Sequence, residues 1–164
     1  MSPVRPDLVE CWVFRVTAAG ATEFLMLRRA AERIFPGIWQ PVTGALGVAE
    51  RAPLAALREV EEETGLGPSD VEAIYDLDLI GSFYSEGVDA IHISVIYAIR
   101  VRPDVAPVLS NEHNGLTWVE ADEAVRRSIW PVYQEALARI ARLVAEPDWA
   151  RWFQLDPTGH RLAR

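Results

Sequence analysis

The chain has 164 residues, half of them hydrophobic, which suits one globular domain with a substantial core. Its formal charge of −8 and its pI of about 4.9 disfavour sequence-independent binding to nucleic acid, because such binding neutralises phosphates with Lys and Arg. The sequence carries neither an apolar run of about eighteen residues nor the apolar stretch of a signal peptide, so we expect a cytoplasmic protein that binds no membrane.

The first part of the chain is rich in strand-forming residues. Residues 9–17 and 23–28 are β-branched, aromatic and apolar runs separated by AAGAT, and they predict a hairpin. The only cysteine, Cys11, lies in the first run, where we expect a buried strand residue rather than a nucleophile. A third extended run, residues 36–44, is punctuated by prolines and a glycine.

A helix of about twelve residues is expected next. Leu54, Leu57 and Val60 follow the helical period. Pro53 suits the first turn, and Gly65 is placed to end the helix.

The second half of the chain returns to strands and ends in helices. The predicted elements are strands over residues 71–83, as one strand or two, 92–101 and 115–120, then helices over residues 120–129 and 131–146. The order of strands, one helix, more strands and further helices predicts a mixed α/β domain.

The last residues, 145–164, form an apolar and aromatic tail. Trp149, Trp152 and Phe153 are too apolar for a solvated terminus. We expect the tail to pack on its own domain or on a partner subunit, which leaves a homodimer open.

Four glutamates crowd into one turn of the first expected helix. Glu59, Glu62 and Glu63 lie three and four residues apart, so their carboxylates share one helix face, while Glu61 points elsewhere. Like charges at this spacing repel unless a cation lies against them. Mg²⁺ is commonly held by one or two carboxylates together with substrate phosphates. The pattern favours a divalent metal site in which Arg58 orients a carboxylate; the alternative is an exposed acidic helix.

The full spacing of the stretch GALGVAERAPLAALREVEEETGL is more informative than the cluster alone. Gly44, Glu50, Arg58-Glu59-Val60, Glu62-Glu63 and Gly65-Leu66 occupy every specified position of the Nudix box. The chain therefore resembles the Nudix (MutT-like) hydrolases over most of residues 8–144. The resemblance implies a single Nudix domain over residues 1–164, an α/β/α sandwich with a mixed β-sheet. It also implies metal-dependent hydrolysis of a nucleoside diphosphate linked to another group.

The resemblance further implies the roles of the box residues. Glu59, Glu62 and Glu63 become ligands of Mg²⁺ or Mn²⁺, directly or through water, and the Gly44 carbonyl is a further ligand. Glu59 and Glu62 belong to the catalytic group together with Arg58, which orients the carboxylates. A metal lowers the pKa of a bound water that attacks in line, so no protein nucleophile is needed.

The base that deprotonates this water often lies outside the box in this family. The candidate here is Glu112 in the segment LSNEHNGLTWVE, and its neighbour His113 is the alternative. An ordinary polar loop explains the same residues equally well.

The substrate is narrowed by a second motif. The segment WQPVTG, residues 39–44, resembles the corresponding segment of the dihydroneopterin triphosphate and dATP pyrophosphohydrolase branch. We expect Arg28, Trp39, Gln40 and Tyr84 to contact a small nucleotide-type substrate, with Arg29 and Phe83 as neighbouring candidates. The three aromatic side chains also suit a core, and the two arginines also suit solvent. A triphosphate would then yield a monophosphate and pyrophosphate. The alternatives are hydrolysis of ADP-ribose, another nucleotide sugar or a dinucleotide, and a ligand-sensing module without turnover.

Overall fold

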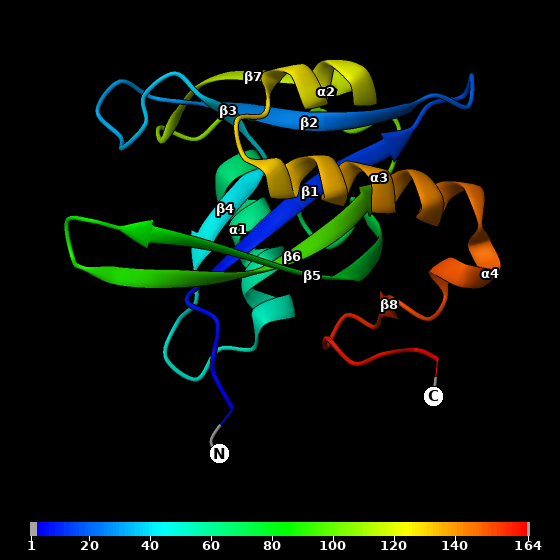
Figure 1. Cartoon of the computed structure of the whole chain (residues 1–164). Helices are drawn as coiled ribbons and strands as arrows, with labels where there is room; N and C mark the ends of the chain where they lie inside the picture. Colours follow the sequence, from blue (N-terminus) through cyan, green and yellow to red (C-terminus); the bar gives the residue numbers. More distant parts are fainter. Residues whose placement is uncertain (1–2, 164) are drawn as a thin grey trace.

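The computed structural model describes residues 3–163, so the outermost residues of the expected domain, 1–2 and 164, lie outside it. Strands and helices follow in the expected order (Figure 1). The strands are β1 (Leu8–Val16), β2 (Thr22–Arg29), β3 (Trp39–Gln40), β4 (Val42–Ala45), β5 (Val71–Ser85), β6 (Ala90–Val101), β7 (His113–Glu120) and β8 (Gln154–Leu155). The helices are α1 (Ala52–Thr64), α2 (Ala121–Arg127), α3 (Pro131–Ala145) and α4 (Pro147–Ala150).

The strands form one mixed sheet. Its order is β3-β2-β1-β6-β5-β8, with β4 also pairing β1 and β7 also pairing β2. The β1–β6 pair is parallel, and the other pairs are antiparallel. Along one edge, β1 pairs first with β4 at residues 8–11 and then with β2 at residues 14–16. This change of partner brings the ends of β2, β3 and β4 together beside the first half of β1.

Helices cover both faces of the sheet. Successive residues of a strand point to opposite faces. Accordingly Cys11 packs in the apolar core that includes α1, while Trp12 packs in the core that includes α3. Figure 1 shows α3 crossing one face in front of β1, with α1 behind the sheet. The expected α/β/α sandwich with a mixed sheet is thus confirmed, and Cys11 is buried as expected.

The buried face of α1 includes Val60 as expected, and Leu57 packs partly against the same core, but Leu54 lies outside it. Leu54 is 39% exposed, whereas the fully buried apolar positions are Ala55, Ala56 and Val60. Small side chains let the helix backbone approach β1 closely, so the bulkier leucine is turned outward. The helix ends as expected at Gly65, whose left-handed φ of 70° suits glycine, and the Gly65 amide donates to the Glu61 carbonyl.

Two strand predictions also need correction. The extended run over residues 36–44 divides into β3 and β4, which pair with different strands, β2 and β1. The region over residues 71–83, in contrast, stays one strand, whose register shifts between Asp76 and Ile80. Asp78 in this bulge has a φ of 51°, so the irregularity that the sequence suggested as a break is absorbed inside β5.

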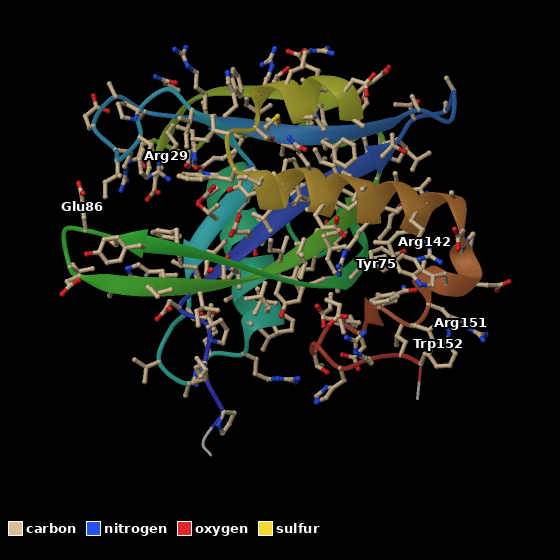
Figure 2. The ribbon with its side chains drawn as sticks, viewed as in Figure 1. Arg29, Tyr75, Glu86, Arg142, Arg151 and Trp152 are labelled. Carbon is tan, nitrogen blue, oxygen red and sulfur yellow. The ribbon has the colours of Figure 1, made fainter. Side chains whose placement is uncertain are left out.

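The aromatic tail packs on its own domain. Trp149 and Phe153 lie with ring centroids 4.4 Å apart, and β8 extends the sheet by pairing with β5 at Ile74 and Tyr75. Figure 2 shows Arg142 of α3 close to the start of this tail, where its guanidinium lies over the Trp149 ring. No helix within residues 3–163 is long and apolar enough to span a membrane.

Candidate active site

The side chain of Glu59 lies against the backbone of β4. A Cβ atom at Gly44 would stand only 1.9 Å from the Glu59 carboxyl carbon, so the position admits no side chain. Because Gly44 pairs with Val9 of β1, the glycine holds the glutamate between the helix and the sheet. The first glycine of the box therefore has a steric role in placing a carboxylate.

Arg58 joins three of the box carboxylates. Its guanidinium donates to both carboxylate oxygens of Glu50, at 2.9 and 3.0 Å, and to Glu59 Oε1 at 2.7 Å. It also donates to Glu62 Oε2 at 3.1 Å and to the Ala45 carbonyl at 3.0 Å. The hydrogen bonds from Arg58 lower the pKa of Glu50 to about 2, so this carboxylate stays ionised. The predicted orienting role of Arg58 has a direct geometric basis here.

Glu63 is the most buried carboxylate of the cluster. The residue is 5% exposed, and its Oε2 atom has no hydrogen-bond partner among residues 3–163. Burial, followed by the charges of Glu59 and Glu112, raises the pKa of Glu63 to about 8. Arg29 acts in the opposite direction. A buried carboxyl group with an unused oxygen is energetically costly, and a cation would relieve that cost.

The donor set suits a hard divalent cation. The unpartnered Glu63 oxygen and the Glu59 carboxylate laid against Gly44 supply oxygen ligands of the kind that Mg²⁺ and Mn²⁺ prefer. Within residues 3–163, no three carboxylate, imidazole or thiol groups already converge as a coordination sphere. Glu59 and Glu62 are ion-pair partners of Arg58 in this arrangement.

Both candidate bases lie beside this cluster. The charge of Glu112 raises the pKa of Glu63 and of Glu59, and its carboxylate pairs with Arg33 at 3.0 Å. His113 is buried, with Nε2 lying 3.8 Å from Glu63 Oε2 and Nδ1 lacking a partner among the described residues. Burial lowers the pKa of His113, which favours its neutral, proton-accepting form.

A cavity of about 410 Å³ lies next to the cluster, on the α3 side of the sheet. Its lining comes from five strands, the loop after β2 and the start of α3. The polar lining residues are Glu10, Arg29, Gln40, Thr43, Ser82 and Tyr133. In Figure 2, Arg29 lies on the side from which the β5–β6 hairpin projects, with Glu86 at the hairpin tip. A pocket of this size accommodates a small organic ligand.

Of the residues expected to contact substrate, Gln40 lines the cavity. This side chain is 4% exposed, accepts a hydrogen bond from Arg29 at 3.4 Å and donates one to Thr43 at 3.2 Å. Arg28 is exposed and lies outside the cavity lining, whereas its neighbour Arg29 lines it. Successive strand residues point to opposite faces, so these two neighbouring arginines take different sides of β2.

The two aromatic candidates lie elsewhere. Trp39 is absent from the cavity lining, and the guanidinium of Arg127 lies 4.7 Å from its ring centroid. Tyr84 is 62% exposed and donates its hydroxyl to Asp89, while the preceding residue, Phe83, lines the cavity. Because strand residues alternate between faces, a shift of one position separates a cavity residue from an exposed one.

Sequence reasoning named Arg29 beside Arg28 and Phe83 beside Tyr84, but it missed Glu10, Phe35 and Trp130. A signal for Glu10 was available, because it is the single charged residue between buried positions in the strand segment VECWV. Phe35 and Trp130 carried no local signal, since long-range packing determines which face they occupy.

Comparisons with known proteins agree with this geometry. A model of the NUDIX domain matches residues 9–140. The chain superposes on a C. elegans Ap4A hydrolase with a TM-score of 0.72 at 20% identity, covering 86% of this chain and 98% of that one. For a Listeria monocytogenes protein assigned as a NUDIX hydrolase, the TM-score is 0.71 at 26% identity, with coverages of 88% and 97%.

Two further similarities involve one solved structure and one curated relative. The E. coli dihydroneopterin triphosphate pyrophosphohydrolase has a TM-score of 0.67 at 24% identity, covering 82% of this chain and 94% of that one. The chain is also 34% identical over 119 residues to the octanoyltransferase of Myxococcus xanthus, which covers 70% of this chain. The chain spans only 31% of that relative's length, so the alignment says nothing about octanoyl transfer.

Proposed function

The chain belongs to the NUDIX domain family of hydrolases, and we propose that it cleaves a nucleoside triphosphate or the analogous dihydroneopterin triphosphate to a monophosphate and pyrophosphate. One observation carries this proposal: Arg29 lines the cavity, and its charge also acts on Glu63 of the carboxylate cluster on α1. A phosphate chain bound at the cluster would therefore meet a cation that also borders a pocket for the ring.

The residues that would hold Mg²⁺ or Mn²⁺ are Glu59, Glu62 and Glu63, with the carbonyl of Gly44. A bound divalent cation supplies charge neutralisation for the diphosphate and a lowered pKa for an attacking water. Arg58 keeps the ionised carboxylates in place through its ion pairs with Glu59 and Glu62. The protein itself thus positions oxygen ligands and leaves the nucleophile to water.

Arg29 and the base candidates complete the arrangement. Arg29 lines the cavity, and its charge acts on Glu63, so it lies between the two regions and suits a phosphate oxygen. Glu112 accepts the proton of the attacking water at its carboxylate, and Arg33 holds that carboxylate in position through their ion pair. His113, with the unpartnered Nδ1, is the alternative acceptor.

The cleavage position gives the first test. Metals that bridge adjacent phosphates stabilise a diphosphate leaving group, so we expect attack at the phosphorus of the monophosphate product. Hydrolysis in ¹⁸O water, followed by mass spectrometry, should place the label in the monophosphate and none in pyrophosphate. A label in pyrophosphate would show that water attacks a different phosphorus.

A substrate panel tests the branch. With Mg²⁺ present, we expect the triphosphates to be hydrolysed with a higher kcat/KM than ADP-ribose, other nucleotide sugars or dinucleoside polyphosphates. Faster turnover of one of those compounds would reject the proposed substrate class while keeping the family. Binding without turnover of any compound would favour a sensing module, which the complete set of box glutamates opposes.

The base is tested by Glu112→Gln. We expect kcat to fall by about 10²- to 10⁴-fold, as for other general bases, with a smaller change in metal affinity. Glu86→Gln is a matched control, because Glu86 lies at the tip of the β5–β6 hairpin. An unchanged kcat in the Glu112 variant would transfer the role to His113 or to a box glutamate.

A further inference from the structure

One acidic side chain of the cavity is not used by the phosphate chemistry. Glu10 lies in β1 between the buried residues Val9 and Cys11, and it faces the α3 side of the sheet together with Trp12. The Ser94 hydroxyl donates to Glu10 Oε1, and the Tyr133 hydroxyl is a second donor to the carboxylate. Burial raises the pKa of Glu10, and these hydrogen bonds act in the opposite direction by favouring the ionised form. Glu10 is thus a carboxylate held by neutral donors at the wall of the cavity.

The surroundings of Glu10 leave space for its carboxyl group. A Cβ at Gly81 would lie 2.5 Å from Ser94 Oγ and 2.9 Å from Glu10 Oε1, so a side chain there would displace the pair. The three residues come from three neighbouring strands, β5, β6 and β1. Tyr133 of α3 lines the same cavity. Glu10 therefore belongs to a defined polar wall, not to a loosely packed surface.

The rest of the cavity suits a planar ring. Phe35 and Trp130 meet edge to face, with ring centroids 5.6 Å apart, and both line the cavity. Phe83 lines it from the β5–β6 hairpin and is 43% exposed. Exposed aromatic faces of this kind stack on heterocyclic bases.

The strand register connects this wall to the phosphate chemistry. Glu10 pairs with Thr43 and Val9 pairs with Gly44, so the carboxylate in the cavity and the glycine beside Glu59 are separated by one residue along each strand. The two regions therefore lie on opposite faces beside the same strand pair, and Arg29, which lines the cavity and acts on Glu63, joins them, so a ligand with its phosphates at the cluster can reach Glu10 with its ring.

The hydrogen-bonding chemistry of an ionised carboxylate then selects the ring. A carboxylate only accepts hydrogen bonds, and it fits two adjacent donors. Guanine and pterin rings both present such a pair, a ring N–H beside an exocyclic amino group. Adenine instead presents a ring acceptor beside its amino group.

We propose that Glu10 is a specificity-determining residue that accepts hydrogen bonds from the N–H and amino group of a 2-amino-4-oxo ring, as found in guanine and pterin. This inference rests on the proposed function for the phosphate end of the substrate and selects among its rings. It favours dihydroneopterin triphosphate and guanine nucleotides over dATP.

Equilibrium binding without divalent metal tests the ring preference independently of hydrolysis. The ligands are dGMP, dIMP, which lacks the exocyclic amino group, dAMP and neopterin, with affinities measured by calorimetry. We expect dGMP or neopterin to bind the unmodified protein about 10- to 100-fold more tightly than dAMP, and dIMP to fall between them. The comparison of dGMP with neopterin separates the two sources of the same ring edge. Equal affinities for all four ligands would overturn the proposal.

Glu10→Gln tests the residue itself, because the amide retains the volume but faces the ring donors with a donor of its own. We expect the preference for dGMP over dIMP and dAMP to disappear, while Glu86→Gln retains it. If the unmodified protein bound dAMP more tightly than dGMP, and Glu10→Gln kept that preference, the carboxyl group of Glu10 would be neutral. That result would overturn the proposal. Should the variant fail to fold, the comparison of dGMP with dIMP on the unmodified protein still decides.

These outcomes are separable from those of the proposed function. Ring-selective binding with no triphosphate hydrolysis under Mg²⁺ would reject the proposed reaction and keep the role of Glu10. Hydrolysis with no ring selectivity would do the reverse.

Discussion

The carboxylate cluster on α1 and the carboxylate of Glu10 in the cavity have partners of opposite kinds. On α1, the guanidinium of Arg58 contacts Glu50, Glu59 and Glu62, so the carboxylates are already paired with a cation. In the cavity, Glu10 receives a hydrogen bond from the neutral hydroxyl of Ser94. This difference indicates which ligand each region suits. The α1 cluster suits cations and the phosphates that accompany them, and Glu10 suits neutral hydrogen-bond donors.

The largest effect is expected when a carboxylate of the α1 cluster is removed. Glu59→Gln should lower kcat by about two to four orders of magnitude, because metal stabilisation of transition-state charge contributes several kcal/mol, and each ~1.4 kcal/mol is tenfold. The circular dichroism spectrum should stay unchanged. Glu61→Gln is the matched control, since Glu61 is exposed on the same helix and lies outside the Arg58 network. Equal losses in both variants would contradict a specific metal-ligand role.

A smaller effect is expected on KM when an aromatic residue that lines the cavity is removed. Phe83→Ala should raise KM by about tenfold, since stacking of a base on an aromatic ring contributes about 1–3 kcal/mol. Tyr84→Ala should change KM little, because this side chain is exposed and bonded to Asp89. Steady-state kinetics on both variants compares adjacent residues of one strand. A larger effect at Tyr84 would return the substrate contact to the residue that the sequence suggested.

Stability measurements separate the two regions without any catalysis. Millimolar Mg²⁺ should raise the melting temperature by a few degrees, because an ion that binds only the folded state stabilises it by mass action, and ~1 kcal/mol corresponds to about 2–4 °C at this chain length. The shift should shrink in Glu63→Gln and persist in Glu10→Gln. Differential scanning calorimetry with and without chelator measures it. A shift lost equally in both variants would contradict two separate regions.

The smallest expected effect is the pH dependence that Glu10 contributes. Its pKa in the folded protein is raised above the ordinary value of 4.5, so the folded state binds more protons than the unfolded state above that pH. Stability from this group is therefore present at low pH and is lost as the pH rises from 4.5 through the folded pKa. Its slope cannot exceed about 1.4 kcal/mol per pH unit for one proton.

Urea unfolding between about pH 5 and 8 without metal measures this term as the difference between the unmodified protein and Glu10→Gln. The unmodified protein should lose stability relative to the variant as the pH rises. Parallel curves would show that Glu10 carries no raised pKa in the folded state.

The sequence by itself determined the box and the order of elements. Helical periodicity is local, so the spacing of Glu59, Glu62 and Glu63 was enough to place their carboxylates on one face. The spacing also included Gly44. The structure explains why this position is a glycine, because a side chain there would collide with Glu59. The family and the α/β/α architecture followed from these residues and are confirmed.

Only the tertiary structure decided which residues form the cavity. The sequence left Arg28 and Arg29, and Phe83 and Tyr84, as alternatives, and the structure places Arg29 and Phe83 in the lining while Arg28 and Tyr84 are exposed. Glu10 meets its partner Ser94 across 84 positions of the chain, a contact that no local pattern encodes. Register and long-range pairing depend on the whole sheet, so the ring pocket emerges only when all its strands are assembled.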